Sequence, residues 1–307
     1  MTIKKTGGGR FSPAGDRYVY IGAGTGGEGR SGYPPFTLVA TNDNMTSDND
    51  LIRRFDDGQT VMLDSGIFWL TNQHMRAHKG ITMDTALSLA PEDIDGFDEL
   101  FTRFVTLVKK HEDNLWGYVE LDQGGRDNKI KTRARLEALG LRPMPVYHPL
   151  NDGWDYFDEL ASSYDRICVG NIVQAHTALR SKIIRTIWER HRDYPHLWIH
   201  GLGYTPNALL HSYPFDSVDS STWLGPVRWW HLPKMVSADL ENISDHQGET
   251  HQIHRVRRNR VKSEALMAWT VHSATMQWRA HAAEMAALGI EGLPPRAESE
   301  VAPCPSA

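Results

Sequence analysis

Cysteine is scarce in this sequence of 307 residues, which contains only Cys168 and Cys304. Two cysteines are too few for a disulfide framework or for a cysteine-rich zinc module. No apolar run approaches the roughly 20 residues that a membrane-spanning helix needs. The first ten residues are basic and rich in glycine, and they lack the apolar segment of a secretory signal. We therefore expect a cytoplasmic protein without a membrane partner.

A strong charge of either sign is also lacking, since the formal net charge is −5. Hydrophobic residues make up 40% of the chain and charged residues 23%, which is typical of globular proteins and excludes wholesale disorder. The net charge argues against a protein that coats nucleic acid with its whole surface. It leaves room for a local basic patch.

Short β-rich runs alternate with helical stretches along the chain. This alternation predicts an α/β fold, with a parallel sheet closed as a single (β/α)8 TIM barrel over residues 1–290 and a frayed, proline-rich tail at 291–307. Strands are expected at Arg17–Gly22, Phe36–Ala40, Thr60–Asp64, Trp116–Asp122, Pro143–His148, Arg166–Gly170, His196–His200 and Phe215–Asp219. Helices are expected at Asp93–His111, Lys129–Leu139, Trp154–Ser163, Gln174–Arg192 and Ser263–Leu288.

The segment between Asp64 and Pro91 is predicted to be a long loop and a candidate lid or binding loop. It holds His74 and His78 at i, i+4 spacing, but no carboxylate accompanies them in a recognised metal-binding pattern. The sequence therefore predicts neither a metal site nor a cofactor.

Polar residues stand where the predicted strands end. Asp64, Asp122 and Asp219 end three of them, and His148 and His200 end two others. In a parallel barrel these positions open onto one rim, where active sites lie. Three converging carboxylates suggest acid–base or nucleophilic chemistry. The alternative is that each aspartate caps the helix that follows it.

These strand ends resemble motifs of the tRNA-guanine transglycosylases. Asp64-Ser65-Gly66, with Phe68, is similar to the family's Asp-Ser-Gly-Gly-Phe signature, although Ile67 replaces the second glycine. Four further segments resemble motifs of the family. His200-Gly201-Leu202-Gly203 is similar to its Gly-x-Gly turn, and Ser217–Ser220 to its nucleophile segment. Cys168-Val169-Gly170 is similar to its Val-Gly strand end, and Tyr118–Asp122 to its base-reading strand. The resemblance covers roughly residues 60 to 225.

Two departures indicate which branch of the family the chain resembles. The zinc subdomain of the tRNA enzymes needs three cysteines, and Ser221-Thr222-Trp223 replaces the Pro-Thr-Arg that follows their nucleophile. A zinc-free version resembles the branch of phages and bacteria that inserts 7-deazaguanines into DNA. The resemblance thus implies a queuosine-like DNA modification in which guanine is exchanged for a base such as 7-cyano-7-deazaguanine, in a host cytoplasm if phage-encoded. tRNA is the alternative polymer.

Base exchange requires a glycosidic bond to break through an oxocarbenium-like state. We expect Asp219 to be the nucleophile and Asp64 the general acid and base, with Asp122 holding the purine edge. Asp216, in the same predicted strand as Asp219, is expected to share its face and is the rival nucleophile. Stacking on the base is expected from Phe68 or Tyr204. The remaining predicted substrate-binding residues are Ser65, Gly66, Gly170, His200, Gly201 and Gly203.

A basic cluster follows the last predicted strand and is expected to bind phosphates. It consists of Arg255, Arg257, Arg258, Arg260 and Lys262. A duplex would have to present its guanine outside the stack, which a helicase or ATPase partner could assist. Two other classes stay open: a glycoside or nucleoside hydrolase that uses the same carboxylates with water, and a non-catalytic nucleic-acid-binding barrel whose aspartates are helix caps.

Overall fold

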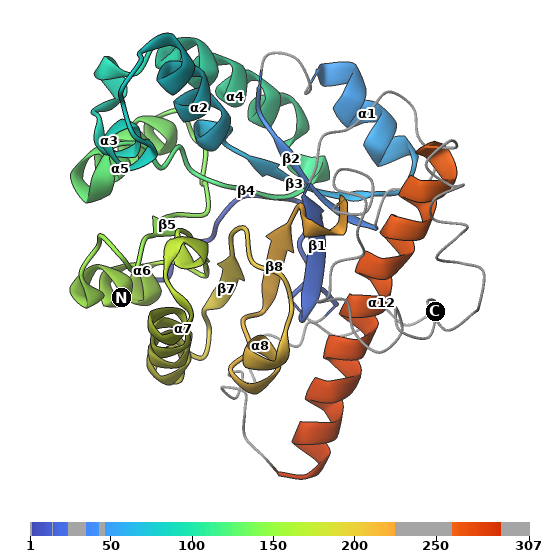
Figure 1. Cartoon of the computed structure of the whole chain (residues 1–307). Helices are drawn as coiled ribbons and strands as arrows, with labels where there is room; N and C mark the ends of the chain where they lie inside the picture. The colour runs from blue at the N-terminus through green and yellow to red at the C-terminus, as the bar shows by residue number, and fades with distance from the viewer. Residues whose placement is uncertain (1, 14, 24–34, 43–46, 225–259, 290–307) are drawn as a thin grey trace.

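The computed structural model describes residues 2–13, 15–23, 35–42, 47–224 and 260–289, with side chains from residue 271 onward in the last of these ranges (Figure 1). The predicted tail at 291–307 and Arg255, Arg257 and Arg258 lie outside the described residues, as do the side chains of Arg260 and Lys262. Within the described part of the chain, no helix is both long and apolar enough to cross a membrane.

The fold is α/β, with eight parallel strands in one curled sheet of order β4-β3-β2-β1-β8-β7-β6-β5. Each predicted strand is present, although several are shorter than expected. The strands are β1 Val19–Ala23, β2 Phe36–Ala40, β3 Thr60–Asp64, β4 Leu115–Tyr118, β5 Val146–Tyr147, β6 Arg166–Val169, β7 Trp198–Gly201 and β8 Ser217–Ser220. They are almost wholly buried, as strands covered on both faces should be.

The first and last strands lie side by side in the sheet, because β1 pairs with β8 from Val19↔Ser217 to Gly22↔Ser220. The strands at the two ends of the order, β4 and β5, are linked just beyond their bounds by a parallel bridge between Val119 and Met144. There the Met144 amide donates to the Tyr118 carbonyl over 2.8 Å. This curvature makes the sheet compatible with a TIM-like fold.

Helices follow most of the strands. They are α1 Asp48–Asp56, α2 Ile67–Ala77, α3 Met83–Ser88, α4 Phe97–His111, α5 Gly125–Ala138, α6 Trp154–Ser163, α7 Thr177–His191, α8 Ala208–Ser212 and α12 Arg260–Ala287. Short 3-10 turns lie at η1 Pro91–Asp93, η2 Glu112–Asn114, η3 Ile172–Gln174 and η4 Thr222–Leu224. The long helix α12 runs beside β1, where the Tyr20 amide donates to Thr275 Oγ1 over 3.0 Å (Figure 1).

The prediction of a long loop between Asp64 and Pro91 is wrong, since α2 and α3 occupy most of that segment. The buried face of α2 includes Thr71 and His74 beside Ile67 and Leu70. Polar residues on the buried face conceal the apolar period by which an amphipathic helix is recognised.

The space enclosed by the curled sheet is filled by side chains at the amino ends of the strands. Phe11, from the N-terminal segment, packs edge-on against Trp116 and Trp198 with centroid distances of 5.2 and 5.0 Å. The Arg166 guanidinium donates to the Trp116 carbonyl over 2.7 Å and lies over the Phe11 ring. This end of the sheet is therefore packed, and the predicted site residues belong to the opposite end.

Candidate active site

The three predicted carboxylates lie at the carboxyl ends of their strands. Asp64 is the last residue of β3, Asp219 is the third residue of β8, and Asp122 follows the extension of β4. Asp64 interacts electrostatically with both of the others, because the charges of Asp122 and Asp219 act on it. The structure thus brings together the acidic residues that the sequence placed at one rim.

Asp64 is the carboxyl group with the most altered acidity at this rim. Burial, followed by the charges of Asp122 and Asp219, raises its pKa to about 7, while hydrogen bonds from the Gly66 and Ser65 amides act in the opposite direction. The Gly66 amide donates to Asp64 Oδ2 over 3.3 Å. A carboxyl group with this pKa can give up and take back a proton near neutral pH.

The turn after Asp64 requires glycine. Gly66 has a φ of 84°, and a Cβ at this position would stand 1.7 Å from the Thr41 carbonyl oxygen. Ser65 is buried, and its Oγ accepts the Ile67 amide at 3.5 Å. These contacts fix the backbone that holds the Asp64 carboxyl group.

Asp219 is oriented by groups from β7 and the turn after it. Its Oδ1 lies 3.1 Å from His200 Nε2 and accepts the Gly203 amide at 3.1 Å. His200 is fully buried, and its other ring nitrogen lies 2.9 Å from Ser217 Oγ. The predicted substrate residues His200 and Gly203 therefore hold the candidate nucleophile in place.

Asp122 is paired with His148, whose Nε2 lies 3.0 Å from Asp122 Oδ2. Burial alone would raise the pKa of Asp122, but the hydrogen bond and charge of His148, with the charge of Lys129, outweigh it and lower that pKa. Lys129 is buried and donates to Asp152 over 2.6 Å. Asp122 is therefore held as a carboxylate, which can accept hydrogen bonds from a ligand.

The glycines at the rim make room for protein side chains. A Cβ on Gly170 would lie 2.8 Å from the His148 ring, and one on Gly201 would lie 2.8 Å from the Phe215 ring. In the structure Gly170 thus accommodates the histidine that pairs with Asp122. The sequence had suggested direct contact of this glycine with the base.

The expectation that Asp216 shares a face with Asp219 is wrong. Successive side chains of a strand point to opposite faces, and the two residues are separated by an odd number of positions. Their side chains would therefore point to opposite faces. Asp216 accepts from Arg17 Nε at 2.6 Å and from the Ile199 amide at 2.9 Å. These bonds give Asp216 a structural role at the amino end of β8.

The two aromatic candidates differ in exposure. Phe68 lies in the first turn of α2 with 65% of its surface exposed, whereas Tyr204 is 3% exposed and its hydroxyl accepts from Asn207. Of these two rings, Phe68 is the one available for stacking on a ligand.

The sequence did not indicate a chain of hydrogen-bonded hydroxyl groups beside Asp219. Tyr20 Oη lies 2.7 Å from Ser220 Oγ, which lies 2.8 Å from Thr205 Oγ1. Burial raises the pKa of Tyr20 to about 12, so its hydroxyl stays protonated. The alternation of side chains along β1 could have indicated to which face Tyr20 points. The contact itself could not be predicted, because Ser220 lies 200 positions further along the chain.

In the described residues, His74, His78 and Asp95 form a group whose ligand atoms are close enough to hold a metal ion. This group lies at the far end of α2 from the Asp64 turn. The three strand-end carboxylates are a separate cluster.

No protein-family model matches the sequence, and no curated protein matches it. The likeness of its strand-end motifs to the tRNA-guanine transglycosylases therefore stays a prediction from those motifs.

Proposed function

We propose that the chain is a base-exchanging transglycosylase, a pentosyltransferase that replaces guanine in DNA with a 7-deazaguanine. The observation that carries the proposal is the cluster of three strand-end carboxylates, two of which, Asp64 and Asp122, have pKa values shifted in opposite directions. Asp64 has a pKa of about 7, while that of Asp122 is lowered. Titratable groups whose environments separate their pKa values are typical of paired acid and base roles.

The proposed reaction has two displacements at the sugar C1′. The Asp219 carboxylate bonds to C1′ as the glycosidic bond to guanine breaks, and Asp64 gives its proton to the departing base. The incoming 7-deazaguanine then returns a proton to Asp64, and its nitrogen bonds to C1′ as the Asp219 ester breaks. Atoms and charge balance without a cofactor, and two inversions retain the configuration.

The hydrogen bonds favour this assignment over helix capping. Asp219 accepts the Gly203 amide, which belongs to the preceding β7 turn, and Asp122 contacts a histidine side chain. Asp64 alone accepts an amide at the start of its following helix. Capping accounts for one of the three carboxylates and leaves the other two without an explanation.

We infer that the curled sheet closes as a single (β/α)8 barrel, with the Val119–Met144 bridge completing the circle of strands. Closure would point the three aspartates into one opening at the carboxyl ends of the strands. The choice of DNA over tRNA rests on the low cysteine count and on the segment at Ser221–Trp223. The basic cluster from Arg255 to Lys262 is proposed to hold the phosphates.

The test offers DNA and tRNA in parallel to the purified chain with labelled 7-cyano-7-deazaguanine. We expect label in DNA, and a loss on the order of 10³-fold or more with Asp219→Asn. Asp98→Asn is the matched control, because the Asp98 side chain is 85% exposed and lies on α4. Circular dichroism verifies the fold of each variant.

Other outcomes would replace the proposal. Label found only in tRNA would overturn the choice of polymer, and guanine release that needs no incoming base would indicate a hydrolase. Salt-sensitive DNA binding without turnover, unchanged after loss of all three aspartates, would indicate a non-catalytic binding protein.

A further inference from the structure

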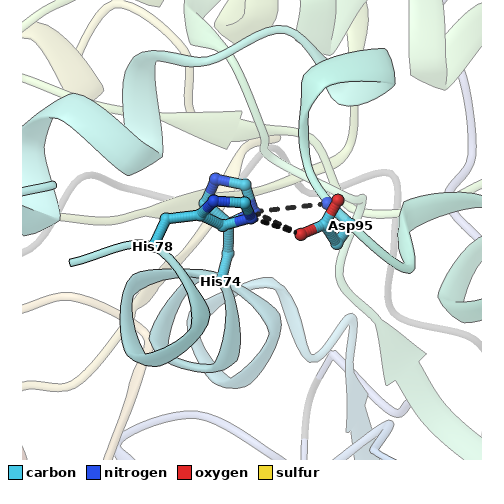
Figure 2. Close-up of side chains that lie close together, drawn as sticks. All are labelled: His74, His78 and Asp95. Carbon is cyan, nitrogen blue, oxygen red and sulfur yellow. Dashed lines mark hydrogen bonds and ion pairs between the residues drawn. The ribbon is translucent and has the colours of Figure 1, made fainter.

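Two histidines at the end of α2 face an aspartate from another part of the chain (Figure 2). His74 and His78 are one helical turn apart, and their ring centroids lie 4.3 Å apart. Asp95 lies between η1 and α4 and reaches toward both rings (Figure 2). Its Oδ2 is 2.6 Å from His78 Nε2 and 3.4 Å from His74 Nδ1.

The distances match those of ligands around one metal ion. Zinc bonds of about 2.1 Å at tetrahedral angles place neighbouring ligand atoms about 3.4 Å apart. The three donor atoms all lie within 4.8 Å of one another, and the His74–Asp95 distance is 3.4 Å. The shorter His78–Asp95 distance can open by rotation, because these side chains are 47% and 69% exposed.

The ligand atoms of His74 and Asp95 are directed at the same space. His74 Nδ1 faces the Asp95 backbone amide at 3.4 Å, which is long for a hydrogen bond, and Asp95 Oδ2 stands 3.4 Å from the same nitrogen. A cation between the nitrogen and the carboxylate would replace this long hydrogen bond. His74 is 5% exposed, so one ligand is held firmly by the protein while the site stays open to solvent.

We propose that His74, His78 and Asp95 bind a divalent transition-metal ion, with zinc as the reference ion and water completing its shell. Two imidazole nitrogens and one carboxylate select such ions over magnesium and calcium, which prefer oxygen ligands. The site joins the end of α2 to the turn that precedes α4. With 11 residues at about 1.5 Å each, α2 separates it from the Asp64 turn by roughly 16 Å. The ion would therefore stabilise α2 and would not contact the strand-end carboxylates.

Isothermal titration of the chelator-treated full chain with Zn²⁺ tests the site independently of any enzymatic activity. We expect one ion per chain that Mg²⁺ does not displace, and a rise in Tm of several degrees. Asp95→Asn and His78→Gln should each weaken this binding by about tenfold or more. His176→Asn is the control, because His176 caps α7 by accepting the Leu179 amide and asparagine retains that cap.

Both substituted side chains are exposed, so we expect the variants to fold, and circular dichroism checks this. Zinc binding to Asp95→Asn or His78→Gln as tightly as to the unmodified chain would overturn the proposal. So would the absence of stoichiometric binding in the unmodified chain, or its loss in His176→Asn.

Discussion

At the scale of single residues, three aspartates of the same chemical type have three different environments. Asp122 is paired with His148, Asp219 is held by His200 and a turn amide, and the half-buried Asp64 interacts with the charges of both. The proposed reaction assigns ligand binding to Asp122, nucleophilic attack to Asp219 and proton transfer to Asp64. This division of roles is the basis of the proposed reaction.

The raised pKa of Asp64 has a consequence for stability. Its pKa is about 7 in the folded protein against a usual value of 3.8, so the folded state favours the protonated form. The stabilisation is fully present below about pH 4 and is lost as the pH rises through about 7. Asp64→Asn, which is neutral at every pH, should therefore be more stable than the unmodified chain at pH 8, by on the order of 2 kcal/mol.

Urea unfolding of both proteins at pH 4 and pH 8 measures this difference. The extra stability of Asp64→Asn should be present at pH 8 and nearly absent at pH 4. An equal difference at both pH values would show that ionisation of Asp64 does not destabilise the folded protein.

The sequence could predict where the site residues lie but not how they are paired. The strand ends were recognisable from short apolar runs, so Asp64, Asp122 and Asp219 could be placed at one rim. The partner of Asp122 is His148, 26 residues further along the chain, and the pairing depends on how neighbouring strands align. Asp95 was missed beside His74 for the same reason, because the two meet only after α2 and α4 pack.

At the scale of elements, strands were predicted better than the helices between them. Most of the strands are short, largely apolar runs, which the sequence displays directly. Helix α4 was also predictable, because Phe97, Leu100, Phe104 and Leu107 follow a helical period. Helices α2 and α3 were not, because α3 is short and α2 buries polar residues.

The turn from β3 to α2 gives a prediction at this scale. Gly66→Ala should destabilise the chain by more than about 3 kcal/mol, because a methyl group would collide with the Thr41 carbonyl at a φ of 84°. Gly58→Ala is the matched control: its φ is 75°, but a Cβ there meets nothing within 4 Å. The control should lose about 1 kcal/mol in urea unfolding. Equal losses in the two variants would contradict the role given to the turn.

At the scale of the whole molecule, the last described helix packs against the first strand of the sheet. Helix α12 packs on β1, with Trp278 1% exposed and tilted against Tyr18 at a centroid distance of 5.7 Å. Arg279 donates to the Arg17 carbonyl over 2.9 Å. Helix α12 therefore covers β1, the strand that pairs with β8, and the candidate nucleophile lies on β8.

Removing the buried indole tests this contact. Trp278→Ala should lower the free energy of unfolding by about 3–5 kcal/mol, whereas Met276→Ala, at a position 51% exposed on the same helix, should change it by less than about 1 kcal/mol. Urea unfolding followed by circular dichroism gives both values. A small loss in Trp278→Ala would show that the sheet is stable without this contact.

In the proposed reaction, Asp219 holds the sugar covalently while one base replaces another. The most direct measurement is peptide mapping by mass spectrometry of the chain denatured during turnover on DNA. We predict a nucleotide-derived adduct on the peptide containing Asp219. In Asp219→Asn we predict no adduct and a loss of exchange on the order of 10³-fold or more. Base exchange at the unmodified rate in Asp219→Asn, or an adduct on a different residue, would contradict the account.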